Sequence, residues 1–378
     1  RVAPGARIAV AAGSRGITDY ALIVKTVVEE LRALGTEPFI FPAMGSHGGA
    51  TAEGQRGVLA EWGITERTIG CPVHSSMDVV RVGETETGIT VFCDATAFAS
   101  DGIVIVNRVK IHTDFHGPTE SGLTKMMAIG LGKRQGAELI HARGARGLRE
   151  EIPRVAAVHL AKSPILCGVA IVEDGAHSVS HIQAVPAQAI PREEPKILER
   201  ARSLLAALPV EECDLLIIDR MGKDISGAGM DNNVLGRMYI DGEPEPPAPR
   251  IGLVAVLRLT EATHGNATGL GFADLASQQL IDAMDEEITR INIQTSGFLR
   301  RGIVPPIAPN DRAAVERALA LLKERDGTGP RVLRIGDTLS LSRLQVSENL
   351  LPELLARPGM ELLAAPEEMR FGQDGALV

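Results

Sequence analysis

The sequence predicts an α/β protein of two domains, with mostly parallel sheets and a cleft between the domains. Three observations predict this class. The chain has 378 residues, which is long for one hydrophobic core and suits two domains. Short, nearly all-apolar segments alternate with segments whose apolar residues recur at helical spacing, as in a parallel sheet covered by helices on both faces. Polar loops that contain glycine follow several of the apolar segments.

The first domain is expected to span residues 1–207 and to begin with a strand. Residues 7–12 form an apolar run that ends at Gly13, which is typical of a buried strand. From Asp19 to Leu34 the spacing predicts a helix, which Gly35 ends. A second strand and a second helix repeat this order at 38–43 and 51–62. The other elements expected in this domain are strands at 89–93, 102–106, 165–172 and 178–185, and helices at 121–131, 134–142, 147–162 and 189–208.

The second domain is expected to span residues 208–345 and to start a new α/β unit. Its predicted strands, both largely apolar, are 213–219 and 251–257. Its predicted helices are 272–284 and 311–323. The remaining residues, 346–378, form a tail whose helix at 348–355 could fold back onto the first domain.

Composition excludes several classes of protein. A net charge of −9 argues against a nucleic-acid binder, because contacts with phosphates need a basic face. No apolar stretch approaches the roughly 20 residues that span a bilayer, and the first residues lack the apolar core of a signal peptide. The four cysteines are scattered, with no pair at metal-binding spacing, and suit a reducing compartment. We therefore expect a cytoplasmic protein with a small-molecule partner and no membrane contact; the oligomeric state stays open.

Four polar loops follow predicted strands, at residues 13–16, 44–49, 107–112 and 221–231. Ligands of doubly wound sheets bind at these carboxyl ends of the strands. In the first loop, Arg15 could hold a carboxylate or phosphate with its planar fork; the alternative is a surface arginine. In the second, His47 lies between glycines that let a ligand approach, and could exchange a proton near neutral pH. The alternative is a turn histidine bonded to the backbone.

Three further histidines and a lysine stand close together in the sequence. His112 and His116 are four residues apart, but Pro118 argues against a helix there and so against a simple zinc pair. Lys125 begins an apolar helix, where desolvation could lower its pKa and free its amine; alone, it would more often be a lysine that reaches solvent. His141 could bind a metal, or simply be favoured by the dipole at a helix end.

These residues resemble the nickel-dependent lactate racemase superfamily, most clearly over residues 8–144. Enzymes of that family carry a nickel pincer nucleotide, which a lysine holds through a thioamide, and a histidine sixteen residues later binds the nickel. Lys125 and His141 match both residue types and their separation. The loops at Ser14-Arg15 and Gly45-Ser46-His47 resemble the family's Thr-Arg and Gly-Thr-His loops.

The resemblance implies a role for each matched residue. Lys125 would bind the cofactor and His141 the nickel, while Arg15 would orient a substrate carboxylate. His47 would be one acid/base residue. The second would be His112, with His116 as its competitor, because three additional residues separate His112 from the lysine. Lys223, in Gly222-Lys223-Asp224, resembles a lysine of the family's second domain and would contact substrate.

The expected function is racemisation or epimerisation of a 2-hydroxy acid by reversible hydride transfer. The Gln and Lys that contact lactate in the namesake enzyme have no match after Asp224, so lactate is not the expected substrate. Three alternatives remain. The scaffold could serve a lyase, isomerase or dehydrogenase with another cofactor or none. It could be a dehydrogenase using free NAD, although no GxGxxG follows the first strands. It could also be a non-catalytic protein that binds a nucleotide or hydroxy acid.

Overall fold

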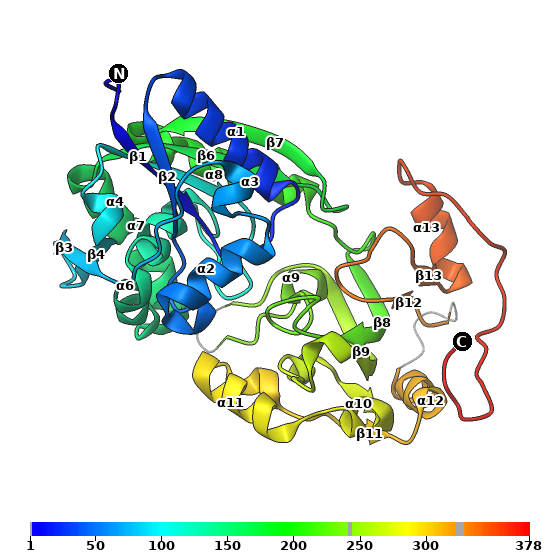
Figure 1. Ribbon diagram of the computed structural model, residues 1–378. Helices are drawn as coiled ribbons and strands as arrows, with labels where there is room; N and C mark the ends of the chain where they lie inside the picture. Colours follow the sequence, from blue (N-terminus) through cyan, green and yellow to red (C-terminus); the bar gives the residue numbers. More distant parts are fainter. Residues whose placement is uncertain (1, 241–243, 323–328) are drawn as a thin grey trace. The chain divides into compact units, whose positions relative to one another are not determined.

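The computed structural model describes residues 2–240, 244–322 and 329–378. It divides into two compact units, one ending at Leu205 and the other running from Ala206 to Val378 (Figure 1). Each unit has its own sheet and its own buried core. The two-domain α/β class with mostly parallel sheets is therefore confirmed.

The first unit is built on a five-stranded sheet in the order β2-β1-β5-β6-β7. The first four strands in this order are parallel, and β7 is antiparallel to β6. The strands are β1 (Arg7–Ala12), β2 (Glu37–Pro42), β5 (Gly102–Arg108), β6 (Ile165–Glu173) and β7 (Val179–Pro186).

Helices cover both faces of this sheet, which explains why β1, β2 and most of β5 are apolar. In β1, Ile8 and Val10 pack against one set of helices, whereas Ala9 and Ala11 face the other. The first face is covered by α1 (Tyr20–Ala33), α2 (Ala52–Glu61) and α3 (Glu66–Ile69). The second is covered by α4 (Ala95–Phe98), α5 (Leu123–Lys125), α7 (Gly144–Lys162) and α8 (Ile190–Leu204).

Two details of this unit differ from the sequence predictions. The strand expected at 89–93 is β4 (Thr90–Asp94), which lies in an antiparallel hairpin with β3 (Val79–Glu84) rather than in the main sheet. The helix expected at 121–131 is not a single α-helix. After the short α5, the chain forms a π-helical segment, η2 (Met126–Gly130), before α6 (Lys133–His141). Segments of π-helix occur frequently at functional sites.

The second unit has a six-stranded sheet in the order β11-β10-β9-β8-β12-β13, parallel except for the pair β12–β13. The strands are β8 (Glu212–Met221), β9 (Arg250–Leu259), β10 (Leu275–Ser277), β11 (Ile307–Ala308), β12 (Val332–Ile335) and β13 (Gln345–Val346). The helices are α9 (Asn232–Leu235), α10 (Gln278–Asp282), α11 (Glu286–Ser296), α12 (Asp311–Leu321) and α13 (Leu351–Leu355).

Two predictions for the second half need correction. The helix expected at 272–284 is in part the strand β10, and only α10 is helical within it apart from a short turn at its start. The helix of the tail does not fold back onto the first domain: Leu350 and Leu354 are buried in the core of the second unit, so α13 packs there. The helix expected at 311–323 is α12, and Lys323 lies outside the described residues.

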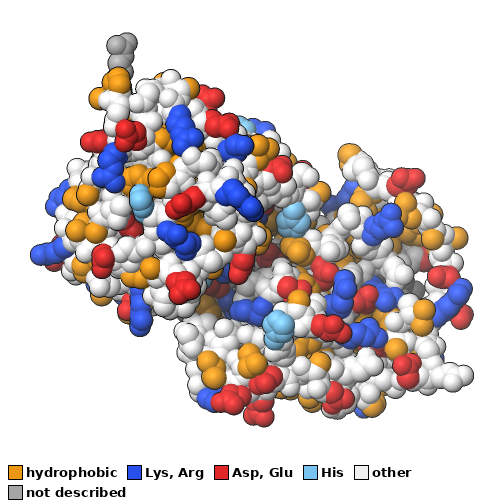
Figure 2. Space-filling model, viewed as in Figure 1, with side chains coloured by type: hydrophobic (Ala, Val, Ile, Leu, Met, Phe, Trp, Pro, Cys, Tyr) orange, Lys and Arg blue, Asp and Glu red, His pale blue; other side chains and the backbone are white. Residues whose placement is uncertain are grey.

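Surface features agree with the composition. Acidic and basic side chains are interspersed on the visible face, without the single basic face of a nucleic-acid binder (Figure 2). Among the helices that the structure describes, none is long and apolar enough to cross a membrane.

Candidate functional site

The loop after β1 carries Arg15 and is fixed by buried groups on both sides of it. The backbone N–H of Gly13 donates to the Tyr20 hydroxyl at 2.6 Å. The backbone N–H of Thr18 donates to a Glu173 carboxylate oxygen, also at 2.6 Å. Arg15, between these two anchors, is exposed at the carboxyl end of the strand. Its side chain is therefore available to an anionic ligand.

The loop after β2 carries His47 and is joined to the Arg15 loop. The hydroxyl of Ser14 is hydrogen-bonded to His47 Nδ1. Gly45 allows the loop to lie directly against α6, because a Cβ atom at this position would be 2.8 Å from Cβ of Ala137. Glycine is therefore required there for the loop to reach the helix that ends at His141.

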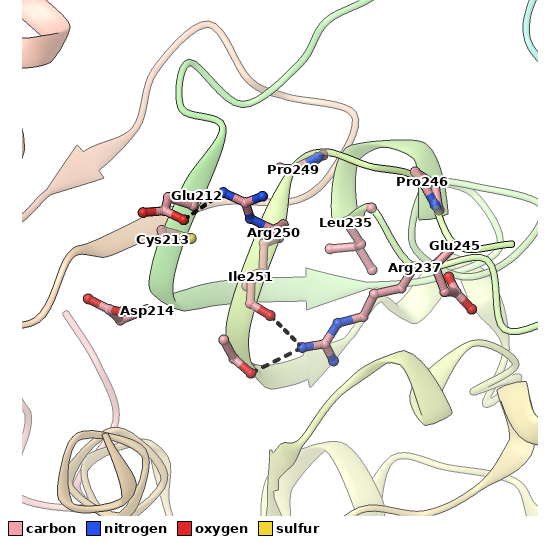
Figure 3. Close-up of a pocket in the computed structure, with 12 residues that line it drawn as sticks. Glu212, Cys213, Asp214, Leu235, Arg237, Glu245, Pro246, Pro249, Arg250 and Ile251 are labelled. Carbon is pink, nitrogen blue, oxygen red and sulfur yellow. Dashed lines mark hydrogen bonds and ion pairs between the residues drawn. The ribbon is translucent and has the colours of Figure 1, made fainter. Parts of the chain in front are cut away.

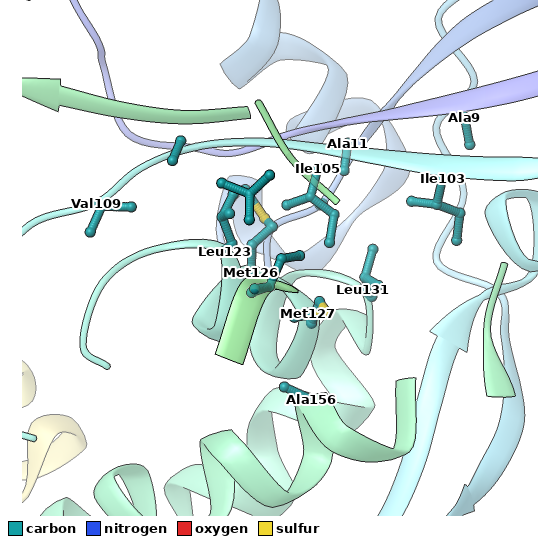
Figure 4. Packing of buried hydrophobic residues seen from close by; sticks show 14 of the residues in the cluster. Ala9, Ala11, Ile103, Ile105, Val109, Leu123, Met126, Met127, Leu131 and Ala156 are labelled. Atoms are coloured by element: carbon teal, nitrogen blue, oxygen red, sulfur yellow. The ribbon is translucent and has the colours of Figure 1, made fainter. Parts of the chain in front are cut away.

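Lys125 lies at the start of a helical segment that is anchored in the core. Leu123, Met126 and Met127 are buried on the same side of the sheet as Ala11 of β1 (Figure 4). The N–H of Thr124 donates to a carboxylate oxygen of the buried Glu194 at 2.9 Å. This bond satisfies a backbone donor at the helix start.

Glycine at position 122 leaves room for the Glu194 carboxylate at this helix start, since a Cβ atom there would be 1.9 Å from a Glu194 oxygen. Burial raises the pKa of Glu194 to about 7, against the effect of its hydrogen bonds with Thr124.

His112 makes a direct contact with Lys125, between Nε2 of the ring and the lysine Nζ. The other ring nitrogen, Nδ1, accepts a hydrogen bond of 3.0 Å from the backbone N–H of Asp114. In a neutral imidazole only one nitrogen carries a proton. Lys125 can donate to Nε2 only when that nitrogen is unprotonated, so the position of the proton on neutral His112 depends on the charge of Lys125.

A buried carboxylate, Glu120, organises the loop that carries His112 and His116. One Glu120 oxygen accepts from the backbone N–H of His112 at 2.6 Å, and the other accepts from the Arg202 guanidinium at 2.5 Å. The ring of His116 lies 3.3 Å from Glu120, with its side chain 40% exposed. In this arrangement His112 contacts Lys125, whereas His116 pairs with Glu120.

Charges and burial lower the pKa values of all the central groups. Burial, then Arg15, Lys125 and His141, lower the pKa of His47 to about 4. Burial and the nearby Lys125 depress the pKa of His112 well below its usual value and, to a lesser degree, that of His141. Burial also lowers the pKa of Lys125 to about 8, although the carboxylate of Asp114 opposes this change. The three histidines are therefore neutral at pH 7.

These mutual effects require the charged groups to be neighbours, since charge interactions fade over about 10 Å in solution. The structure thus brings together five of the seven residues that the sequence singles out: Arg15, His47, His112, Lys125 and His141. His116 lies at the edge of this group and perturbs only His112.

Lys223 belongs to the second unit, where its ammonium donates to the carbonyl of Gly227 at 2.6 Å and to the amide oxygen of Asn292 at 3.1 Å.

Sequence reasoning missed three residues of this region. Glu120 belongs to no motif that the sequence singles out, yet it is 1% exposed. The carboxylate of Asp114 raises the pKa values of Lys125 and His141, whereas the charge of Lys110 lowers that of Lys125. The available signal was the density of charged residues between the strand ending at Arg108 and Lys125, but a loop sequence does not reveal which of them are buried.

His141 is the metal ligand that the sequence predicts at this site. Among the described residues, no three His, Cys, Asp or Glu side chains gather as protein ligands of a metal. A metal here would need donors from a bound cofactor besides His141.

The second unit contains a separate pocket of about 370 Å³, lined among others by Glu212, Arg237 and Arg250 (Figure 3). It lies where β8 and β9 begin, at the opposite ends of these strands from the Lys223 loop. Arg250 pairs with Glu212 at 3.0 Å, and Arg237 donates to the carbonyl of Ile251 at 3.1 Å. Ligands of such sheets bind at the carboxyl ends of the strands. We therefore place the candidate site in the first unit.

The chain is thus a two-unit α/β protein with a cationic, histidine-rich site at the carboxyl ends of its first strands. Residues 2–148 match the model of the lactate racemase N-terminal domain family. This match confirms the resemblance seen over residues 8–144.

Among solved structures, the chain is similar to the lactate racemase apoprotein from Thermoanaerobacterium thermosaccharolyticum. The TM-score is 0.57 with 14% identity, over 89% of this chain and 86% of that one, which shows a shared fold. A protein from Thermotoga maritima matches with a TM-score of 0.48 and 14% identity, over 68% of this chain and 66% of that one. No curated protein sequence matches the chain.

Proposed function

We propose that the chain is a racemase or epimerase of a 2-hydroxy acid that uses a nickel pincer nucleotide. The observation that carries the proposal is the convergence of a lysine with a lowered pKa, three neutral histidines and an exposed arginine in one site. Each of these groups has the chemical state that its role requires.

Lys125 and His141 fit the cofactor. The lowered pKa of Lys125 makes a neutral amine accessible near pH 8, and a neutral amine is the nucleophile needed for a covalent bond. His141 is uncharged at neutral pH, as a metal ligand must be. Because the described residues hold no group of three His, Cys, Asp or Glu side chains that could bind a metal, a cofactor that brings its own donors suits this site. When bound, the cofactor would supply a hydride acceptor for the carbon that bears the substrate hydroxyl.

His47 and His112 would handle the hydroxyl proton. Both are neutral at pH 7 and can accept a proton, because burial and nearby cations lower their pKa values. Inversion at a carbinol carbon requires proton transfer on both faces of the flat 2-oxo acid, so two such groups are needed. His112 is preferred to His116 as the second because it contacts Lys125 directly.

Arg15 would hold the substrate carboxylate as a bidentate partner. It is exposed on an anchored loop, so its guanidinium is accessible to a ligand from solvent. Lys223 retains its predicted role as a substrate contact, and its ammonium would have to exchange the carbonyl of Gly227 or the side chain of Asn292 for the substrate.

The decisive experiment is to produce the protein together with the cofactor-synthesis enzymes. Intact mass and metal content are then measured, and a panel of chiral 2-hydroxy acids is tested for loss of optical purity. We expect a mass increment on Lys125, nickel bound in equal amount, and racemisation of at least one acid.

The variant Lys125→Ala should lose both the increment and the nickel, whereas Lys25→Ala, which removes an exposed lysine of α1, should keep them. Equal loading of the native protein and Lys125→Ala would refute the assignment. Turnover without any mass increment would instead favour another isomerase, a lyase or a dehydrogenase on this scaffold.

A further inference from the structure

Beneath the His47 loop lie three buried polar side chains to which the proposed reaction gives no role. Gln55 of α2 and Lys133 of α6 are 0% exposed, and Asp94 at the end of β4 is 1% exposed. We propose that Gln55 and Lys133 are positioning residues that hold the His47 loop against the helix ending at His141. The inference rests on the proposed function only for the roles of the two histidines.

Gln55 binds the backbone of the loop at three points. Its side-chain amide nitrogen lies 2.5 Å from the carbonyl oxygen of Met44, 3.0 Å from that of Gly45 and 3.4 Å from that of His47. The two hydrogens of one amide group are thus shared among three backbone carbonyls of the loop. A single side chain therefore determines the path of the backbone from the end of β2 to His47.

Lys133 orients that amide and joins it to a second element. Its Nζ donates to the amide oxygen of Gln55 at 3.2 Å and to the carbonyl of Pro42, the last residue of β2, at 2.5 Å. An ammonium group can only donate, so the Gln55 oxygen must face Lys133 and its NH2 group must face the loop. The carboxylate of Asp94, 3.1 Å from Nζ, balances the buried charge.

The backbone of Lys133 indicates that this arrangement is imposed by tertiary contacts. Lys133 has a φ of +51°, a conformation that a lysine rarely adopts, at the first residue of α6. Such conformations persist only where the surroundings fix them, and they cluster at functional sites. The buried side-chain contacts of Lys133 supply this constraint.

The consequence is a fixed relation between His47 and His141. Helix α6 begins at Lys133 and ends at His141, so Lys133 sets one end of the rigid element that carries the predicted metal ligand. Gly45 rests on the middle of the same helix, at Ala137. Buried ion pairs contribute little to stability compared with apolar packing, and their best-attested use is to specify one arrangement.

Hydrogen exchange measured by mass spectrometry on the full chain, without cofactor, tests this inference. In Gln55→Glu the new carboxylate still accepts from Lys133 but can no longer donate to the loop carbonyls. We expect amides of residues 44–50 to exchange about tenfold faster or more, with α6 unchanged. In Lys133→Met, both the loop and the first turn of α6 should lose protection.

Thr36→Val is the matched control, because it also removes one buried hydrogen bond, from the Thr36 hydroxyl to the carbonyl of Leu31 at 2.7 Å. Exchange in residues 44–50 should not change in this variant. The imidazole NMR signals of His47 should shift in Gln55→Glu, whereas those of His159, which is hydrogen-bonded to Ser163, should stay in place.

Unchanged exchange at 44–50 in a folded Gln55→Glu protein would overturn the inference. So would a uniform rise in exchange over the first unit that Thr36→Val reproduces, because it would reveal only a general loss of stability. If Gln55→Glu does not fold, Gln55→Met, which keeps the volume and removes the polar group, takes its place in the same comparison. No turnover is measured, so a failed racemisation assay leaves this test unaffected.

Discussion

The amine of Lys125 should be far more reactive toward acylating reagents than an ordinary lysine. Its pKa is lowered from 10.5 to about 8, first by burial and then by the charges of Arg15 and Lys110. At pH 8 about half of the side chain would be the neutral amine, compared with roughly 0.3–0.4% for a lysine of unperturbed pKa. The neutral fraction therefore rises by about a hundredfold. A less basic amine is also a weaker nucleophile, so a net gain of roughly tenfold in rate is expected.

Competitive labelling with N-acetoxysuccinimide, followed by peptide mass spectrometry between pH 6 and 10, measures this difference. In the reaction the amine lone pair bonds to the acetyl carbon, N-hydroxysuccinimide leaves and the amine proton passes to solvent. Labelling of Lys125 should reach half its maximum near pH 8, with the exposed Lys25 as the internal reference.

Substitution of the charged neighbours of Lys125 should shift its labelling curve along the pH axis in opposite directions. Asp114 raises the pKa of Lys125, so Asp114→Asn should move its labelling curve to lower pH, whereas Arg15→Gln should move it to higher pH. A labelling curve for Lys125 that rises only near pH 10 would show that its pKa is not lowered. A curve that neither substitution shifts would show that Asp114 and Arg15 do not act on the amine.

Three further outcomes are expected. His47→Ala should keep the mass increment on Lys125 and the nickel but lower the rate of racemisation by about 10²–10⁴-fold. The control His181→Ala, on the edge strand β7, should change neither loading nor rate. Loss of cofactor loading in His47→Ala would contradict the acid/base role. Arg15→Gln should raise the pKa of His47 above about 4, because Arg15 is among the cations that lower it, and an unchanged NMR titration would refute this. Glu120→Leu should destabilise the first unit by roughly 1–3 kcal/mol in urea unfolding, because the backbone N–H of His112 loses its buried acceptor; an unchanged unfolding curve would be inconsistent with that bond.

Patterns of burial explain which parts of the fold could be predicted from sequence. Strands such as β1 are buried on both faces, so their apolar runs, as in Ile8–Ala12, are easily recognised in the sequence. β3 has no fully buried residue and β10 is three residues long, so neither gives a clear periodic signal. The tail helix was assigned to the wrong unit because amphipathic spacing shows which face is buried, but not against what.

The candidate site could likewise be predicted only where a local sequence pattern marks its residues. Loops at strand ends and the spacing of Lys125 and His141 pointed to the residues that now lie together. Their supports could not be inferred, because each depends on a contact between distant segments. Glu120 and Arg202 are 82 positions apart, and Lys133 and Gln55 are 78 apart. A single sequence contains no information that links such pairs.

Glu173 and Glu194, which anchor the Arg15 loop and the Lys125 turn, and Arg202, which neutralises Glu120, all come after residue 148. The stretch recognisable from its relatives is thus not self-sufficient. A fragment that ends at residue 148 would keep Arg15, His47, His112, Lys125 and His141. It would lose the side chains that hold their loops in place. A shortened protein that is meant to keep this site should therefore extend at least to the end of α8.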